Sequence, residues 1–198
     1  DQEYVVYDTE TTGLNSGVDQ MIEIGAVKVK NDEIIDRFDE LIDPGRHIPD
    51  KITALTCITD EMVMESPEIE TILPQFLKFA GDAVLVAHNA SFDVSFIEEN
   101  CRQQGIEPDF TSVDTVGLAR VLLPTLSKFK LNVVAKALNI SQEHHHRAVD
   151  DARVTAEIYV KFIQMLEERG IETLDQMNHF GAHNAEAIRK MPSYHVIV

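Results

Sequence analysis

Two carboxylates follow a short apolar run near the start of the chain, and their spacing predicts a metal site. Residues 4–7 read Tyr-Val-Val-Tyr, and Asp8 and Glu10 come directly after them. A β-branched and aromatic run of this kind predicts a buried strand, on which side chains two positions apart point to the same face. Two acids at the end of a buried strand repel each other, and a bound divalent cation removes that repulsion. The alternative is a pair of solvated turn acids, because Asp-x-Glu is a common pattern.

A third acid is predicted to turn inward from the start of a helix. Residues 83–87 form an unbroken apolar run, which is typical of a strand buried on both faces. Asn89 or Ser91 is expected to cap the helix that follows and continues to about residue 104. Asp93 then lies in the first turn, on the same helical face as several apolar residues, so its carboxylate is predicted to point toward the core.

Helical phase separates two adjacent acids in a long helix predicted for residues 148–168. Asp151 shares a stripe with Ile158 and Phe162, and a stripe that is mostly apolar must face the sheet. Asp150 shares its stripe mainly with charged residues. We therefore expect Asp151 to project inward as a functional carboxylate and Asp150 to face water.

The elements that must position these acids predict an α/β domain. Alternating apolar residues predict strands at residues 21–30 and 33–42, and Asn31 and Asp32 between them are a hairpin signal. The first three strands are thus expected to form an antiparallel meander within a mixed central β-sheet flanked by helices. Further helices are predicted at residues 52–55, 60–64, 69–80, 116–123 and 131–138, and a short strand at 111–115.

Composition limits the classes of protein and partner. The 198 residues suffice for one domain with a full core, and the net charge is 17 − 34 = −17. Such an acidic chain is a poor candidate for tight non-specific nucleic-acid binding, because phosphate contacts need Lys and Arg. Cys57 and Cys101 are too few for a disulfide framework. No apolar run approaches the length of a membrane span, and nothing resembles a signal peptide, so we expect a cytoplasmic protein without membrane contact.

Three motifs in this order resemble those of the DEDDh family of 3′→5′ exonucleases. Residues 8–14 match the first family motif, residues 88–93 match the second, and residues 146–151 match the third, His-x4-Asp. The sister branch of the family has a tyrosine where this chain has Arg147, so the histidine branch is the match. The resemblance runs through most of residues 4–166. It is strongest toward the proofreading exonuclease domain of PolC-type bacterial DNA polymerase III.

This resemblance implies a ribonuclease H-like (DEDD exonuclease) fold with two Mg²⁺ or Mn²⁺ ions held by oxygen ligands. Asp8 matches the ligand that bridges both ions, and Glu10 and Asp151 match ligands of the first ion. Asp93 matches a ligand of the second ion. His146 matches the residue that takes a proton from the attacking water, and imidazole suits that role because its pKa ordinarily lies near about 6.5.

The resemblance also implies contacts with the terminal nucleotide, chiefly from the turn after the first strand. For Leu14, His88 and Phe92 a plain structural role is the open alternative. Cys57 stands where many relatives have glycine. This departure bears on the geometry of the loop around Leu55 and does not affect the expected metal ligands. The residues expected to contact substrate are Thr9, Thr11, Thr12, Leu14, Leu55, His88, Asn89 and Phe92.

The implied function is a metal-dependent exonuclease that releases nucleoside monophosphates from single-stranded DNA 3′ ends and proofreads during DNA replication. An RNA-trimming or oligoribonuclease-type enzyme and a non-catalytic partner-binding module are the alternatives. A DNA polymerase, covalently joined or as a partner subunit, is expected to deliver the primer end. Residues 1–170 are expected to form the exonuclease domain. Residues 171–198 are expected to form a helical tail toward another domain, and its last residues read as a strand with nothing left to pair with.

Overall fold

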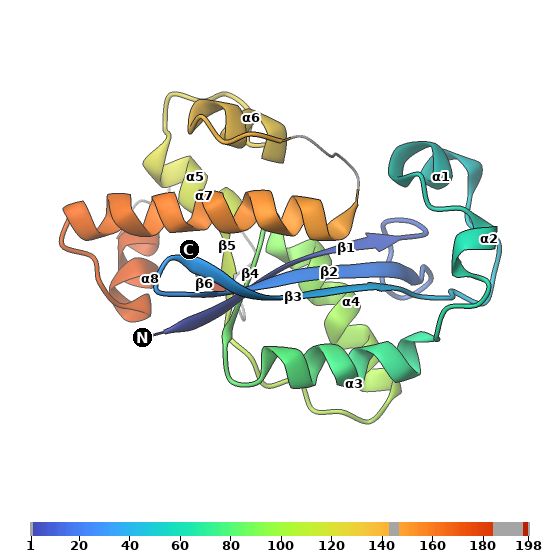
Figure 1. Ribbon diagram of the computed structural model, residues 1–198. Coiled ribbons are helices and arrows are strands. Elements are labelled where there is room, and N and C mark those ends of the chain that lie inside the picture. Colours follow the sequence, from blue (N-terminus) through green and yellow to red (C-terminus); the bar gives the residue numbers. More distant parts are fainter. Residues whose placement is uncertain (1, 143–146, 184–195, 198) are drawn as a thin grey trace.

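A six-stranded mixed β-sheet forms the centre of the protein in the computed structural model, which describes residues 2–142, 147–183 and 196–197 (Figure 1). The strand order across the sheet is β3-β2-β1-β4-β5-β6. Antiparallel pairing joins β1 to β2 and β2 to β3, whereas β4, β5 and β6 continue the sheet in parallel. The predicted mixed sheet is confirmed. The strands are β1 (Glu3–Thr11), β2 (Met21–Lys30), β3 (Glu33–Leu41), β4 (Val84–Ala87), β5 (Ser112–Asp114) and β6 (Val196–Ile197).

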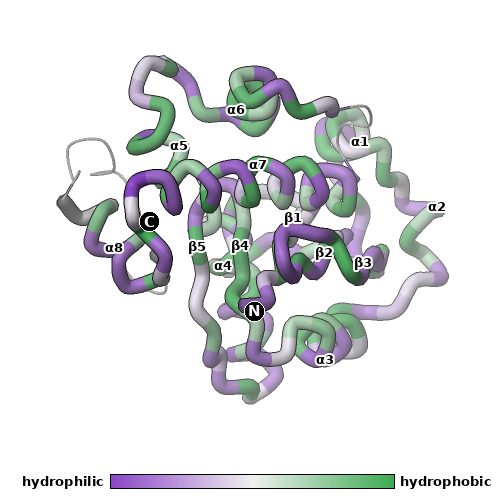
Figure 2. The backbone as a smooth tube through the Cα atoms, turned by 60° about the vertical axis from the view of Figure 1, so that its left-hand side comes forward, coloured by the Kyte–Doolittle hydropathy of each residue, from purple (hydrophilic) through white to green (hydrophobic). Residues whose placement is uncertain are grey.

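Helices cover both faces of this sheet. α3 and α4 pack on one face, and α5, α6 and α7 lie on the other (Figure 1). β4, which lies between these layers, is buried throughout and hydrophobic along its length (Figure 2). The helices are α1 (Asp50–Thr56), α2 (Asp60–Val63), α3 (Ile69–Ala80), α4 (Ala90–Gln103), α5 (Thr115–Leu122), α6 (Leu131–Ala137), α7 (Ala148–Glu168) and α8 (Leu174–His183).

The antiparallel meander of β1, β2 and β3 is confirmed. Asn31 and Asp32 both have left-handed backbones, with φ of 52° and 65°, which is the geometry of a tight two-residue hairpin turn. Asparagine and aspartate tolerate this region better than most residues do. This turn joins β2 to β3. In the neighbouring pair of strands, Gly25 of β2 lies opposite Asp8 of β1, and Glu23 lies opposite Glu10.

The start of α4 differs from the sequence prediction. Asn89 precedes the helix, but its side chain makes no capping hydrogen bond, and Ser91 lies within the helix. Asn89 instead has a left-handed backbone with φ of 64°, and its N–H donates to Asp114 Oδ1 at 3.0 Å. A buried carboxylate on the neighbouring strand therefore fixes this turn, which local sequence patterns do not reveal.

The C-terminal strand prediction is wrong in one respect. Val196 and Ile197 form β6, which pairs in parallel with Ser112 and Val113 of β5. In α8, Met177 is buried in the same core as α7. The end of the chain thus finds a partner within this sheet, and the division at residue 170 stays a prediction. Within the described part of the chain, no helix has the length and apolar character needed to span a membrane.

Candidate active site

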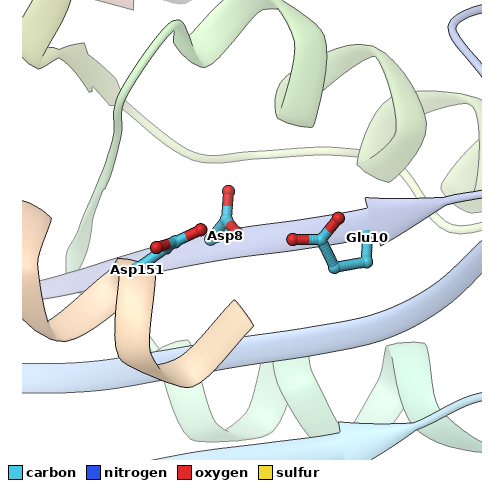
Figure 3. A group of neighbouring side chains, drawn as sticks. All are labelled: Asp8, Glu10 and Asp151. Carbon is cyan, nitrogen blue, oxygen red and sulfur yellow. The ribbon is translucent and has the colours of Figure 1, made fainter. Parts of the chain in front are cut away.

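Three carboxylates converge where the first turn of α7 crosses the sheet. Asp8 and Glu10 extend from the same face of β1, and Asp151 reaches them from α7 (Figure 3). One carboxylate oxygen from each residue lies within 4.8 Å of the others. The side chains of Asp8 and Asp151 come from positions 143 residues apart, and Asp150 is not part of this group. An all-oxygen cluster of this kind suits Mg²⁺ or Mn²⁺, so the donor set fits a divalent cation.

Asp93 lies beside this cluster, buried at 2% exposure in the first turn of α4. Its Oδ1 accepts hydrogen bonds from the backbone N–H of Thr9 at 3.0 Å and from the Thr9 hydroxyl at 2.6 Å. Its negative charge is the largest neighbouring charge acting on Asp8. Asp93 therefore points inward, as its helical phase predicts. Thr9, expected to contact substrate, has a second role because its hydroxyl holds Asp93.

The acids of this site hold protons more tightly than ordinary carboxylates do. Burial, followed by the charges of Asp93, Glu10 and Asp151, raises the pKa of Asp8 well above its usual range. Burial and the charge of Asp151 raise the pKa of Glu10 to about 8. Burial raises the pKa of Asp93 to about 7, against the hydrogen bonds from Thr9. A cation entering this cluster would displace protons, which is how metal binding couples to pH.

His146, expected to act as the base, lies outside the described residues, as do His144 and His145. The described chain resumes at Arg147, the residue before α7. The prediction for His146 thus stays a prediction.

The turn after β1 contains both exposed and internally bonded side chains. Leu14 is 87% exposed, which leaves its side chain available to pack on a ligand. The Thr11 hydroxyl donates to the Gly13 carbonyl at 2.5 Å, and the Thr12 hydroxyl bonds to Asp19 Oδ1 at 3.1 Å. The hydroxyls of Thr11 and Thr12 are thus engaged in shaping the turn.

The structural alternative for His88 is the one that the geometry supports. Its Nδ1 lies 2.7 Å from the Thr115 hydroxyl, and its Nε2 lies 2.6 Å from the Phe129 carbonyl. Burial lowers the pKa of His88 to about 4, so the ring is neutral and links β4, α5 and the following loop. Because both ring nitrogens are taken, the expected contact of His88 with a phosphate is not supported.

The two other candidates of the second motif differ in exposure. Phe92 is partly buried and packs against Phe96, with ring centroids 5.1 Å apart, so much of its surface serves the core. The side chain of Asn89 is exposed.

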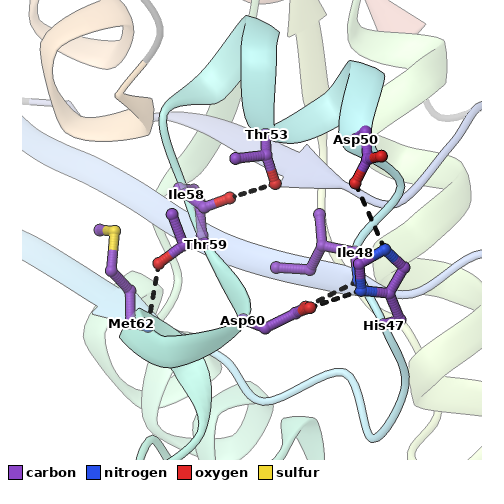
Figure 4. A network of polar contacts seen from close by, with 8 residues as sticks. All are labelled: His47, Ile48, Asp50, Thr53, Ile58, Thr59, Asp60 and Met62. Atoms are coloured by element: carbon purple, nitrogen blue, oxygen red, sulfur yellow. Dashed lines mark hydrogen bonds and ion pairs between the residues drawn. The ribbon is translucent and has the colours of Figure 1, made fainter.

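Leu55 lies in α1, within a segment held by its own polar network (Figure 4). Asp60 Oδ1 accepts the N–H of Ile48 at 2.8 Å, and Asp60 Oδ2 lies 2.5 Å from His47 Nδ1. Cys57, which ends α1, has a left-handed backbone with φ of 63°, the conformation that glycine adopts most easily. The segment thus keeps a turn suited to glycine, and Leu55 is 55% exposed beside it.

Sequence reasoning missed Glu23, which is fully buried in β2. Its carboxylate binds the backbone of Ala148 and the side chain of Arg147 at the start of α7. The available signal was a lone acid within an apolar strand, since a buried acid needs a partner. The sequence alone could not say which partner that is.

Comparison with known proteins identifies the family. The family model described as "Exonuclease" matches residues 5–159. The DNA polymerase III PolC-type of Clostridium perfringens is 51% identical over 199 residues, which cover 100% of this chain. The corresponding protein of Caldanaerobacter subterraneus is 45% identical over 196 residues, which cover 99% of this chain. The chain spans 14% of the length of each of these relatives.

Solved structures share the fold. Exonuclease X in complex with 5′-overhanging duplex DNA is 29% identical, with a TM-score of 0.72, and the match covers 90% of this chain and 99% of that one. E. coli exonuclease I in complex with a dT13 oligonucleotide has a TM-score of 0.78 at 15% identity, covering 93% of this chain and 46% of that one. The nuclease domain of 3′hExo, a DEDDh family member, has a TM-score of 0.73 at 19% identity, covering 86% and 94%.

The ribonuclease H-like fold expected from the sequence is thus confirmed, and the last two similarities concern the fold alone. The family match, the identity over the whole chain and the cluster of motif carboxylates agree. This chain belongs to the exonuclease family.

Proposed function

We propose that this chain is a 3′→5′ exonuclease that uses divalent metal to release nucleoside monophosphates from single-stranded DNA ends. The observation that carries this proposal is the cluster of Asp8, Glu10 and Asp151, with Asp93 beside it. These four acids lie within the three family motifs. Asp8 and Glu10 come from β1, Asp93 from α4 and Asp151 from α7. Asp8, Glu10 and Asp93 have raised pKa values, so a cation that balances their charge is favoured.

Asp8, Glu10 and Asp151 are proposed to hold one Mg²⁺ or Mn²⁺ ion, and Asp8 and Asp93 a second. Such ions, when bound, supply positive charge to a phosphodiester group undergoing hydrolysis. The Thr9 hydroxyl and N–H keep Asp93 in place by occupying its Oδ1, which leaves Oδ2 for a ligand.

His146 is proposed to accept the proton of the attacking water. It precedes Asp151 by five residues and lies next to Arg147, whose position at the start of α7 is fixed by Glu23. A neutral imidazole near neutral pH is suited to this transfer.

The 3′ nucleotide is proposed to lie along the turn after β1, where Leu14 packs on its base. Leu55, exposed on α1, is proposed to contact the same nucleotide. Asn89, Phe92 and the backbone of Thr11 and Thr12 are proposed as further contacts.

The biological role proposed for this chain is proofreading, as a segment of a cytoplasmic bacterial DNA polymerase III. The support is its similarity to 14% of the length of PolC-type polymerases. With a net charge of −17, the isolated chain should bind single-stranded DNA weakly, so the polymerase would deliver the primer end. With Ca²⁺ in place of Mg²⁺, we expect a dissociation constant of about 1 μM or weaker, in the range of non-specific contacts.

The decisive experiment incubates this chain with matched DNA and RNA oligomers labelled at the 5′ end, with Mg²⁺ or with EDTA. The expected result is a ladder that shortens from the 3′ end of DNA, with mononucleotide products and no cleavage in EDTA. Faster digestion of RNA than of DNA would favour the RNA-trimming alternative. No cleavage of either oligomer by a protein that binds Mn²⁺ would favour the non-catalytic alternative.

A further inference from the structure

Glu23 is a fully buried acid, and its hydrogen bonds within the described part of the chain go to the start of α7. Its Oε1 accepts the backbone N–H of Ala148 at 2.7 Å. Its Oε2 accepts from Nε and Nη2 of Arg147, at 2.9 and 2.6 Å. The two oxygens thus bind two consecutive residues, and the charge that burial would penalise is neutralised by the Arg147 guanidinium.

These contacts supply a helix cap that α7 does not make for itself. The residue before α7 is Arg147, and its side chain makes no capping hydrogen bond. The first N–H groups of a helix have no partner within the helix, and an acidic oxygen is a strong acceptor for them. Glu23, from a strand far away in sequence, takes this role for Ala148. The carbonyl of Arg147 in turn accepts the N–H of Asp151 at 3.1 Å, so Glu23 is linked to Asp151 through one residue.

Gly25 explains why α7 can approach β2 so closely. A Cβ atom at Gly25 would lie 2.1 Å from the Val149 nitrogen and 2.3 Å from the Ala148 carbonyl carbon. Both distances are shorter than the van der Waals contact that a Cβ atom can make with backbone atoms, so any larger residue would clash with α7. In the β1–β2 register, Gly25 is opposite Asp8, and Glu23 is opposite Glu10. Directly opposed residues of antiparallel strands point to the same face. Glu23 and Gly25 therefore lie beside the two strand ligands, under the helix that supplies the third.

We propose that Glu23 is a positioning residue that fixes the first turn of α7 over β1, so that Asp151 meets Asp8 and Glu10 at metal-binding distance. Gly25 provides the space for this docking, and Arg147 provides the countercharge. Glu23 itself uses both carboxylate oxygens on the helix. It acts on the site through Asp151, and the inference rests on the metal site of the proposed function.

Glu23→Gln is the sharpest variant, because glutamine keeps an oxygen for the Ala148 N–H while it removes the charge that orients Arg147. Partners behind the ligands of a metal commonly contribute 10–100-fold to metal affinity or activity. We therefore expect the Mn²⁺ dissociation constant, measured by titration calorimetry on the full chain, to rise about tenfold. On a single-stranded DNA oligomer, kcat should fall by a similar factor, and KM should stay within about twofold.

Asp60→Asn is the matched control. Asp60 also binds a backbone N–H and a side chain, the imidazole of His47, but it holds α2 and the segment before α1. This variant should keep the Mn²⁺ affinity and kcat of the wild type, even where its melting temperature falls. Arg147→Gln should weaken Mn²⁺ binding as Glu23→Gln does. The double variant should lose little more than either single one, because both residues act through the same link.

Equal Mn²⁺ affinity in the wild type and in folded Glu23→Gln would overturn the positioning role. A loss of melting temperature alone, with kcat and Mn²⁺ affinity preserved, would also overturn it and would leave Glu23 a stabilising residue only. Failure of the proposed function has a different signature. A wild-type chain that binds Mn²⁺ but leaves DNA intact would contradict nuclease activity, while the difference in Mn²⁺ affinity would still test Glu23.

Discussion

Two kinds of acid lie under the first turn of α7, one fully buried and the other partly buried, and they differ in where their countercharge comes from. Glu23 receives a guanidinium and a backbone N–H from the protein itself. For Asp8 and Glu10, on the neighbouring strand, burial raises the pKa, and the charges of other carboxylates raise it further. The neighbouring charges that act on Asp8 come from Asp93, Glu10, Asp151 and Glu23.

This difference gives the two kinds of acid different roles: Glu23 holds the structure, and Asp8 and Glu10 are available for chemistry. In the folded protein the charge of Glu23 is balanced by its ion pair with Arg147, so its carboxylate can hold the start of α7. Among the described residues, no Lys or Arg forms an ion pair with Asp8 or Glu10. Burial and the neighbouring carboxylates raise the pKa values of these two acids, which favours a cation from solution. The same helix turn thus depends on the ion pair of Glu23 to position the site acid Asp151.

The largest effect should come from removing a carboxylate of the metal site. Asp8→Ala or Asp151→Ala should abolish cleavage, because loss of a group that stabilises transition-state charge commonly lowers kcat by about 100-fold or more. Without metal, the melting temperature should stay level or rise, since one source of carboxylate repulsion is gone. Single-turnover cleavage rates and thermal melts in EDTA measure both. A variant that keeps more than about a tenth of the wild-type rate would contradict the metal-ligand assignment.

A substitution at His146 tests whether cleavage depends on a proton acceptor near the first turn of α7. The cleavage rate should rise between about pH 6 and 7 as the imidazole loses its proton. His146→Ala should lower kcat about 100-fold and flatten that part of the pH profile. The rate is measured at saturating Mg²⁺ across the pH range. An unchanged rise in the variant would exclude His146 as the base.

The stability of the metal-free protein should fall as pH rises, because the site acids bind protons more tightly when folded. The pKa of Glu10 is raised from its ordinary 4.5 to about 8, and that of Asp93 from 3.8 to about 7. Between these values the folded state holds more protons on these two acids than the unfolded state does. Their contribution to stability is therefore greatest below about pH 3.8 and decreases up to about pH 8. Melting temperatures in EDTA should decline over this window.

Two comparisons sharpen this prediction. Saturating Mg²⁺ should remove most of the decline, because the cation replaces the protons. Glu10→Gln should reduce the decline in EDTA, since it removes one titrating group. A metal-free melting temperature that rises from pH 5 to pH 8 would show that the site acids are not the groups that control stability.

The smallest effect is expected at Asp150, the residue next to Asp151. Asp150→Ala should change kcat and Mn²⁺ affinity by less than about twofold, because substitutions outside the core and the metal ligands are nearly neutral. The same cleavage and calorimetric assays measure it. An inactive Asp150→Ala beside an active Asp151→Ala would mean that the helix presents the other face to the site.

The hydrophobic periodicity of the sequence determined many of the helices and strands and the faces that their residues occupy. The alternation of residues 21–30 and the helical spacing of residues 69–80 and 148–168 gave elements with the observed bounds. Helical phase also selected Asp151 over Asp150, and the structure brings Asp151 to Asp8 and Glu10. Each of these inferences concerns which face a residue occupies, and the local repeat of the backbone sets that face.

Tertiary structure decided which neighbour each face meets. The pairing of Glu23 with Arg147 spans 124 residues, and Thr9 holds Asp93 across 84. His88 is enclosed by Thr115 and Phe129, and β6 completes the sheet at β5. The physical reason is that a hydrogen bond or an ion pair depends on two groups meeting in space. A sequence pattern shows that a buried acid or a strand edge needs a partner, and only the packing of distant segments provides it.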